Sequence, residues 1–332
     1  MALSESISMI GGGSWATALV KVLNENHHAV DWWIRNQKII DHLRQQHHNP
    51  GYISAVQFRP EWIHPQGDIR AVAEKNDIIV LAVPSAFIQQ AVKELSSDHF
   101  INKLIISAIK GMIPDENLLI AQFLEKYFGV DEKNIVNISG PSHAEEVALE
   151  KLTYLTMACS DLSNAQRACR LFDCAFVRCA PSDDVYGTEY AAVLKNIYAI
   201  TAGIFHGLGY GDNFHAVLVS NCIEEMERFL KAVYPIKRDI KDSAYLGDLL
   251  VTAYSQFSRN RTLGAMIGKG YSVKNAQLEM NMVAEGYYAS KCIHEVNRKF
   301  NVNMPIAEAT YRTLHENAVA EEEMKVVTAA IS

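Results

Sequence analysis

The segment ISMIGGGSWA, residues 7–16, is the part of the sequence that indicates the fold most directly. The apolar run Ile7–Ile10 is typical of a buried strand, and a helical pattern follows the glycines to about Asn26. Gly11, Gly13 and Ala16 match the spacing G-x-G-x-x-G/A. The first glycine permits a tight turn, the second lets the backbone approach a pyrophosphate, and the small third residue lets helix and strand pack closely. The pattern predicts a strand–turn–helix unit that binds a dinucleotide; the alternative is an ordinary glycine-rich turn.

The end of the next predicted strand, Val30–Ile34, bears on which dinucleotide binds. An acidic residue usually stands there and binds the ribose hydroxyls. Arg35 takes its place in this chain. A guanidinium group can bind a 2′-phosphate through two hydrogen bonds. Arg35 therefore permits NADP as well as NAD, the alternative being an arginine that only faces solvent.

The rest of the chain predicts two domains. Strand-like and helix-like segments alternate in the first half, which favours a doubly wound, mostly parallel sheet. After residue 183 helical patterns dominate. We predict an α/β fold, with a Rossmann-type dinucleotide-binding domain at 1–183 and an all-helical domain at 184–332. The expected strands are Ile7–Ile10, Val30–Ile34, Ile78–Val83, Leu104–Ala108 and Ile135–Ile138, with Thr153–Ala158 and Ala175–Val177 as extensions of the sheet. The expected helices are Tyr186–Phe205, Asn213–Val233, Tyr245–Ser258, Val273–Phe300 and Pro305–Glu316, and Glu321–Ser332 is expected to fray.

Composition narrows the class of protein. A chain of 332 residues suits two domains. Its net charge of −7 disfavours nucleic acid or an anionic membrane as the main partner. No secretory leader is evident, and no apolar run approaches the ~18 residues that a bilayer requires, so membrane insertion is not expected. Six cysteines without a C-x-x-C pair indicate reduced thiols and a cytoplasmic protein, and without H-E-x-x-H no metal site is expected.

Lys195 is the most informative single residue. It lies in the segment 191–204, which is apolar on nearly all sides and is therefore expected to be buried. Burial lowers the pKa of a lysine toward the range useful for proton transfer. The alternative places Lys195 at the one wet edge of its helix. Asn196 follows it and has no evident packing reason to be polar.

Further polar residues stand at predicted element ends. Lys110 follows a strand of the sheet, where ligands bind in this architecture. Ser142 is expected to cap a short helix, with Glu145 completing a capping box. Asp248 fits a helix N-cap equally well. Arg259 next to a helix start suits phosphate binding, although surface arginines are common.

Taken together, these motifs resemble the soluble NAD(P)-dependent glycerol-3-phosphate dehydrogenases of bacteria. The resemblance covers essentially the whole chain, in order, and its specificity lies in the ordered set. The matching segments are Gly11–Thr17, Ala82–Ser85, Lys110-Gly111, Gly140–Ser142, Leu194–Asn196, Gly207–Asn213, Gly247–Leu249, Ser258–Asn260 and Met282–Gly286. The chain departs from the family's usual pattern at Gly12, Ala16, Tyr190–Ala192 and Lys151–Thr153, none of which is an expected catalytic group.

The resemblance implies a Rossmann-type domain, a helical domain and an active site between them. It implies dihydroxyacetone phosphate and sn-glycerol 3-phosphate as substrates, NAD or NADP as cofactor, a role in glycerophospholipid synthesis, and it is compatible with a homodimer. Lys195 is implied as the catalytic acid/base, with Lys110, Asp248 and Asn196 beside it. Implied substrate contacts are Lys110, Gly140, Ser142, Lys195, Asp248, Ser258, Arg259 and Asn260. Implied cofactor contacts are Gly11, Gly13, Ser14, Trp15, Arg35, Lys110, Ala144, Arg259, Val283 and Glu285.

The sequence leaves two alternative functions open. One is another reductase that pairs a Rossmann-type domain with helices and a lysine, of the ketopantoate or 6-phosphogluconate type. The pair of segments Gly247–Leu249 and Ser258–Asn260 argues against it. The other is a redox-sensing module that binds the cofactor without catalysis, which the presence of Lys110, Lys195 and Asp248 disfavours.

Overall fold

The chain folds into two compact units, each with its own hydrophobic core. The computed structural model describes residues 5–280 and 282–332. The first unit runs up to Ile109 and resumes at Ile120–Val185, and the second comprises Lys110–Leu119 and Tyr186–Ser332. The change of unit after Val185 lies close to the expected boundary. The short segment Lys110–Leu119, however, belongs to the helical unit, which the sequence did not indicate.

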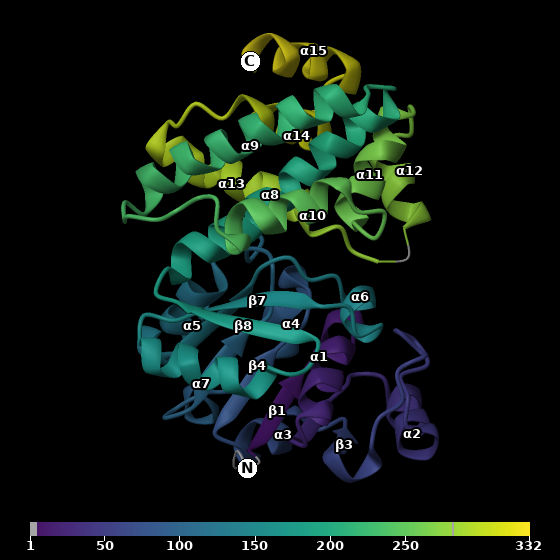
Figure 1. Cartoon of the computed structure of the whole chain (residues 1–332), viewed down its shortest axis with the longest axis vertical. Helices are drawn as coiled ribbons and strands as arrows, with labels where there is room; N and C mark the ends of the chain where they lie inside the picture. Colours follow the sequence, from purple (N-terminus) through teal and green to yellow (C-terminus); the bar gives the residue numbers. More distant parts are fainter. Residues whose placement is uncertain (1–4, 281) are drawn as a thin grey trace. The chain divides into compact units, whose positions relative to one another are not determined.

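The first unit is built on a sheet that, within the described residues, has eight strands (Figure 1). The strand order is β3-β2-β1-β4-β5-β6-β7-β8. Neighbouring strands are parallel except for β6 and β7, which are antiparallel. The strands are β1 Ser6–Ile10, β2 Ala29–Trp33, β3 Ile63–Gln66, β4 Ile78–Leu81, β5 Leu104–Ser107, β6 Ile135–Ser139, β7 Thr153–Ala158 and β8 Val177–Ser182. The predicted doubly wound, mostly parallel sheet is confirmed.

The two edges of the sheet differ from the prediction. Strand β3 was not predicted, because its four residues contain Pro65. Proline is unfavourable inside a sheet but is tolerated in an edge strand such as β3. At the other edge, β8 begins at Val177 and extends past the expected end of the strand to Ser182. It also contains a proline, Pro181, at an edge position.

Helices flank this sheet and the direction of winding reverses at β1, which pairs with both β2 and β4. In open parallel sheets such a reversal marks the ligand crevice, at the carboxyl ends of the strands. The glycine turn follows β1 at this end. The helices of the unit are α1 Ser14–Glu25, α2 Gln37–Gln46, α3 Ile69–Lys75, α4 Ile88–Ala91, α5 Ile120–Phe128, α6 Ala144–Ala148 and α7 Leu162–Phe172, with 3-10 turns η1 Pro60–Trp62, η2 Ser85–Phe87, η3 Ser97–His99 and η4 Glu132–Asn134.

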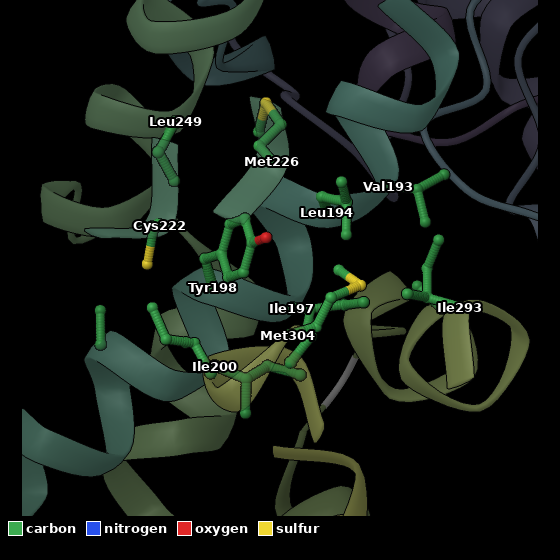
Figure 2. Close-up of a cluster of buried hydrophobic side chains, with 14 of the residues drawn as sticks. Val193, Leu194, Ile197, Tyr198, Ile200, Cys222, Met226, Leu249, Ile293 and Met304 are labelled. Carbon is green, nitrogen blue, oxygen red and sulfur yellow. The ribbon is translucent and has the colours of Figure 1, made fainter. Parts of the chain in front are cut away.

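The second unit is helical, as predicted, and the long helix α8 (Val185–Gly207) runs through its core (Figures 1 and 2). Val193, Leu194 and Ile197 on α8 have no exposed surface. Their side chains meet residues of the surrounding helices, among them Met226 and Ile293. The other helices are α9 Asp212–Val233, the π-helical turn η5 Ser243–Gly247, α10 Asp248–Tyr254, α11 Arg259–Gly268, α12 Val273–Glu279, α13 Glu285–Phe300, α14 Pro305–His315 and α15 Ala320–Ala330.

Glycines bring α8 and α11 into backbone contact. A Cβ atom added to Gly264 of α11 would collide with the carbonyl of Ile200 on α8, and one added to Gly203 of α8 would collide with the carbonyl of Arg261. Gly286 at the start of α13 is packed equally tightly against the carbonyl of Asn196. Side chains larger than hydrogen would therefore hold these helices apart.

Two helical expectations in this unit were wrong. The predicted helix Val273–Phe300 is two helices, because the chain leaves the helical path after Glu279 and resumes it at Glu285; Asn281 lies outside the described residues. The expected fraying after Glu321 is contradicted by α15. Met324 of α15 is fully buried, and Arg312 of α14 forms an ion pair with Glu323 at 2.6 Å.

Candidate active site

The glycine turn contains one glycine that the fold requires and one that it does not. Gly11 has φ of +134°, and a Cβ atom there would collide with the carbonyl of Ala82 after β4. Gly13 has an ordinary φ of −83°, and a Cβ atom there would meet nothing within 4 Å. The fold itself therefore has room for a side chain at Gly13. A side chain there would, however, keep a pyrophosphate from approaching the backbone at the start of α1. The turn fits a dinucleotide.

The other predicted cofactor residues of the first unit lie at ends of its elements. Ser14 and Trp15 form the first turn of α1. Arg35 is exposed, two residues beyond β2. Ala144 is the first residue of α6.

The segment Gly140–Ser142 follows β6 and forms a tight turn. Gly140 has φ of +100°, and the Ser142 hydroxyl donates a hydrogen bond to its carbonyl at 3.0 Å. The expected capping box of Ser142 and Glu145 was wrong. The N-cap of α6 is His143 and no side-chain cap is formed there, because the Ser142 hydroxyl is already used within the turn.

In the second unit, Asp248 joins two lysines. Its Oδ1 accepts a hydrogen bond from Lys195 Nζ at 2.5 Å, and its Oδ2 accepts one from Lys110 Nζ at 3.2 Å. Lys195 is 5% and Asp248 1% exposed, so the predicted burial of Lys195 is confirmed. Asp248 begins α10, but its carboxylate binds the lysines, so it is not the helix N-cap.

This arrangement shifts the pKa values of both partners. Burial lowers the pKa of Lys195 from 10.5 to about 7, although the negative charge of the Asp248 carboxylate acts in the opposite direction. The positive charge of Lys110 adds to the lowering. Burial alone would raise the pKa of Asp248, yet the two lysine charges and their hydrogen bonds hold it below its ordinary value. A lysine whose pKa is lowered in this way is suited to proton transfer near neutral pH, and the lowered pKa of Asp248 favours the carboxylate form beside it.

Thr252 is a member of this cluster that the sequence analysis missed. Its hydroxyl accepts a hydrogen bond from Lys195 Nζ at 3.1 Å and donates one to the backbone carbonyl of Asp248 at 2.6 Å. The signal was available, because Asp248 and Thr252 are four residues apart on α10 and hence on one helix face. Asp248 and Thr252 together accept two of the three hydrogen bonds that the Lys195 ammonium can donate.

Asn196 belongs to a chain of directed hydrogen bonds. Gly286 N donates to Asn260 Oδ1, Asn260 Nδ2 donates to Asn196 Oδ1, and Asn196 Nδ2 donates to the carbonyl of Lys110, each at 2.9 Å. The break between α12 and α13 matters here, since it leaves Gly286 N–H in a first helical turn, where it has no intrahelical acceptor. The chain fixes the backbone of Lys110 relative to α8.

The predicted phosphate-binding residues surround the start of α11. Ser258 is the N-cap, and its hydroxyl accepts from Arg261 N at 3.3 Å. Arg259 is exposed in the first turn and donates to the carbonyl of Val283 at 3.4 Å, while Glu285 opens α13. Arg259, which was expected to lie next to a helix start, is the first residue of α11. A guanidinium and a helix N-terminus at one place suit an anionic ligand.

Two kinds of feature are absent from the described residues. No group of three or more histidine, cysteine, aspartate or glutamate side chains there is placed to hold a metal ion. None of the described helices has the length and apolar character needed to cross a bilayer.

Comparison with known proteins gives one family for both units. Residues 6–165 match the model for the N-terminus of NAD-dependent glycerol-3-phosphate dehydrogenase, and residues 184–325 match the model for its C-terminus. The chain is similar to the glycerol-3-phosphate dehydrogenase [NAD(P)+] of Limosilactobacillus reuteri, with 35% identity over 95% of this chain and 94% of that protein. It is 36% identical to the enzyme of that name from Bacillus pumilus, over 98% and 95%.

A solved structure extends the likeness to three dimensions. The crystal structure of glycerol-3-phosphate dehydrogenase from Coxiella burnetii aligns with a TM-score of 0.91 and 28% identity, covering 98% of this chain and 99% of that one. These matches support the predicted family and not the ketopantoate or 6-phosphogluconate alternative. The chain belongs to the NAD-dependent glycerol-3-phosphate dehydrogenase family.

Proposed function

We propose that this chain interconverts dihydroxyacetone phosphate and sn-glycerol 3-phosphate with NAD or NADP as cofactor, and so supplies glycerol 3-phosphate for glycerophospholipid synthesis. Family membership supports the reaction. The observation that carries the chemistry is a buried lysine, Lys195, whose pKa is lowered to about 7 and which is hydrogen-bonded to Asp248.

Most of the residues that we assign to the cofactor belong to the first unit. The open space at Gly13 and the start of α1 would receive the pyrophosphate, with Ser14, Trp15 and Ala144 as further contacts. Arg35 would face the adenosine ribose, and its charge tolerates a 2′-phosphate. Lys110, Arg259, Val283 and Glu285 are the residues of the second unit that we assign to the cofactor. When bound, the nicotinamide supplies or accepts the hydride.

Lys195 would handle the proton. In the reducing direction its ammonium form donates a hydrogen bond to the ketone oxygen, stabilises the developing negative charge and then transfers the proton. In the oxidising direction its neutral form accepts the proton of the substrate hydroxyl. Asp248 orients the Lys195 ammonium and shares its charge with Lys110, which we also assign to the substrate.

The substrate phosphate would bind at the start of α11. Arg259 and Ser258 lie there, and the helix N-terminus adds a partial positive charge. Asn260 and Asn196 use their side-chain amides in the hydrogen-bond chain to Lys110, so we assign them to the placement of substrate-binding groups. Gly140 and Ser142 are further substrate residues. Binding energy at the non-reacting phosphate would help to position the carbonyl.

The deciding experiment is steady-state reduction of dihydroxyacetone phosphate with NADH and NADPH in turn, followed through oxidation of the cofactor. We expect turnover in the wild type, and a loss of roughly a thousandfold or more in kcat for Lys195→Ala, since the proton donor is gone. Lys231→Ala, on the exposed face of α9, is the control. Near-native kcat in Lys195→Ala would refute the role of Lys195, and activity on ketopantoate alone would refute the substrate.

Two further properties belong to this proposal. We place the enzyme in the cytoplasm, because its six cysteines are free thiols in the structure, as a reducing compartment keeps them. We also propose a homodimer, supported by the exposed apolar residues Leu250, Tyr254 and Phe257 on and after α10. Light scattering of the purified chain tests it, and a monomer at micromolar concentration would contradict it.

A further inference from the structure

We propose that three buried side chains, Trp32, Asn49 and Thr17, bind the three successive carbonyl groups of the glycine turn, so that the turn presents only N–H groups to the pyrophosphate of the cofactor. The inference rests on the proposed placement of the cofactor at this turn. It assigns Trp32, Asn49 and Thr17 as positioning residues for cofactor binding.

Each carbonyl of the turn has its own side-chain donor, and the Gly13 carbonyl also accepts the backbone N–H of Thr17 at 2.9 Å as part of α1. The indole Nε1 of Trp32, on β2, donates to the carbonyl of Gly11 at 2.6 Å. The amide Nδ2 of Asn49 donates to the carbonyl of Gly12 at 3.2 Å. The hydroxyl of Thr17, on α1, donates to the carbonyl of Gly13 at 2.9 Å.

Asn49 connects this set to a loop that is distant in sequence. It lies between α2 and η1 and its side chain is fully buried. Besides the Gly12 carbonyl, its Nδ2 donates to the Thr17 hydroxyl at 2.9 Å, and its Oδ1 accepts from Gly51 N at 3.1 Å. Because the amide donates to Thr17, the Thr17 hydroxyl has its own hydrogen left for the Gly13 carbonyl. The direction of every bond in the set is therefore determined.

The physical reason lies in the charge of the ligand. A pyrophosphate is anionic, so it is attracted by N–H groups and repelled by the partial negative charge of a carbonyl oxygen. Glycine-rich backbone has few steric barriers to peptide rotation, since it lacks Cβ atoms. Hydrogen bonds from the protein side hold all three carbonyls in one orientation and leave the opposite side of the turn to the ligand. Preorganisation of this kind lowers the cost of binding.

A matched control is available in the same loop. Asn24 of α1 holds the far end of the loop, where its Nδ2 donates to the carbonyl of Arg59 and its Oδ1 accepts from Arg59 N, both at 3.1 Å. Asn24 is 5% exposed and also buried within the first unit. Asn24→Ala therefore removes a buried amide and loosens the same loop, but removes no donor from the glycine turn.

The experiment is a titration of Asn49→Ala, Trp32→Phe and Asn24→Ala with NADH, ADP-ribose and adenosine, by calorimetry or by competition, after each variant is shown to be folded by circular dichroism. Trp32→Phe keeps an aromatic ring against Phe58 and removes the N–H donor together with part of the ring volume. We expect Kd for NADH and ADP-ribose to rise roughly fivefold to tenfold in Asn49→Ala and Trp32→Phe, the worth of one hydrogen bond to an oriented group. Adenosine, which has no pyrophosphate, should bind as to the wild type, and Asn24→Ala should leave all three affinities within twofold.

Three results would overturn the inference: unchanged NADH affinity in Trp32→Phe, an equal loss in Asn24→Ala, or an equal loss for adenosine. If Asn49→Ala does not fold, Trp32→Phe alone decides. Gly13→Ala separates this inference from the proposed cofactor site, since the fold has room for the methyl group. Unchanged NADH affinity in Gly13→Ala would reject the cofactor site itself. A loss in Gly13→Ala without one in Trp32→Phe would reject only the role of the donors.

Discussion

At the scale of single residues, Asp248 sets the electrostatics of the catalytic cluster. One buried carboxylate accepts hydrogen bonds from two lysines, so the cluster carries an excess positive charge whenever both are protonated. That excess favours loss of a proton from the more deeply buried lysine, Lys195, and Lys110 adds to the lowering of its pKa. If Lys195 is the proton donor, as proposed, Lys110 should tune its pKa in addition to any contact that Lys110 makes with a ligand.

The pH profile of Lys110→Gln tests this tuning. The substitution removes a positive charge near Lys195, so the pKa of Lys195 should rise above about 7. In the proposed mechanism, reduction of the ketone requires protonated Lys195, so kcat for reduction should fall as the pH rises through that pKa. The fall should therefore occur at a higher pH in Lys110→Gln. Lys110→Arg keeps the charge and should keep the wild-type midpoint; equal midpoints in all three proteins would exclude the effect.

At the scale of secondary-structure elements, glycines determine how closely α11 and α13 approach α8. Gly264 and Gly286 have α8 carbonyls where their Cβ atoms would be. This close approach places Asn260 and the N–H of Gly286 within hydrogen-bond distance of the residues that hold Lys110. The catalytic cluster and the helix packing thus depend on the same contacts.

Substitution of one of these glycines should be costly. Gly264→Ala forces α11 and α8 apart, and we expect a loss of about 1–3 kcal/mol in the free energy of unfolding, as for other overpacked cores. Gly211→Ala is the control, because Gly211 has φ of −88° and open space at its Cβ position. Urea denaturation compares the two. Equal midpoints for Gly264→Ala and Gly211→Ala would contradict the tight contact.

At the scale of the whole molecule, the two units have separate hydrophobic cores. In the proposed function they carry different residues of the site. The glycine turn belongs to the first unit, whereas Lys195, Asp248 and Lys110 belong to the second. Cofactor binding and proton transfer should accordingly be separable by mutation.

Thermal unfolding with and without NADH tests this separation. A ligand at about 100 times its Kd stabilises the folded form by about 2.7 kcal/mol. We expect Lys195→Ala to lose turnover but to retain the NADH-dependent rise in unfolding temperature. Gly13→Ala should lose most of the rise at the same NADH concentration. Loss of the rise in Lys195→Ala would show that the two functions are not separable.

Local features of the sequence were sufficient for much of the fold. The glycine spacing after β1, the alternation of apolar strands with helices and the apolar character of α8 each predicted the observed element, because a buried strand or helix must be apolar whatever surrounds it. The failures share a cause as well. Each depends on neighbours that are remote in sequence: β3 pairs with β2, Gly286 N beyond the break before Glu285 donates to Asn260, and α15 packs against α11.

The sequence alone was enough to predict a dinucleotide-binding turn, the burial of Lys195 and the family of the chain, because each depends on short, ordered segments. Only the tertiary structure decided what Lys195 contacts, because Asp248 and Lys110 are separated from it by long stretches of chain. The tertiary structure also shows that Gly11 and Gly13 of the glycine turn differ. Gly11 is required by the fold because the carbonyl of Ala82, just after strand β4, leaves no space for a Cβ atom there, whereas the Cβ position of Gly13 is open.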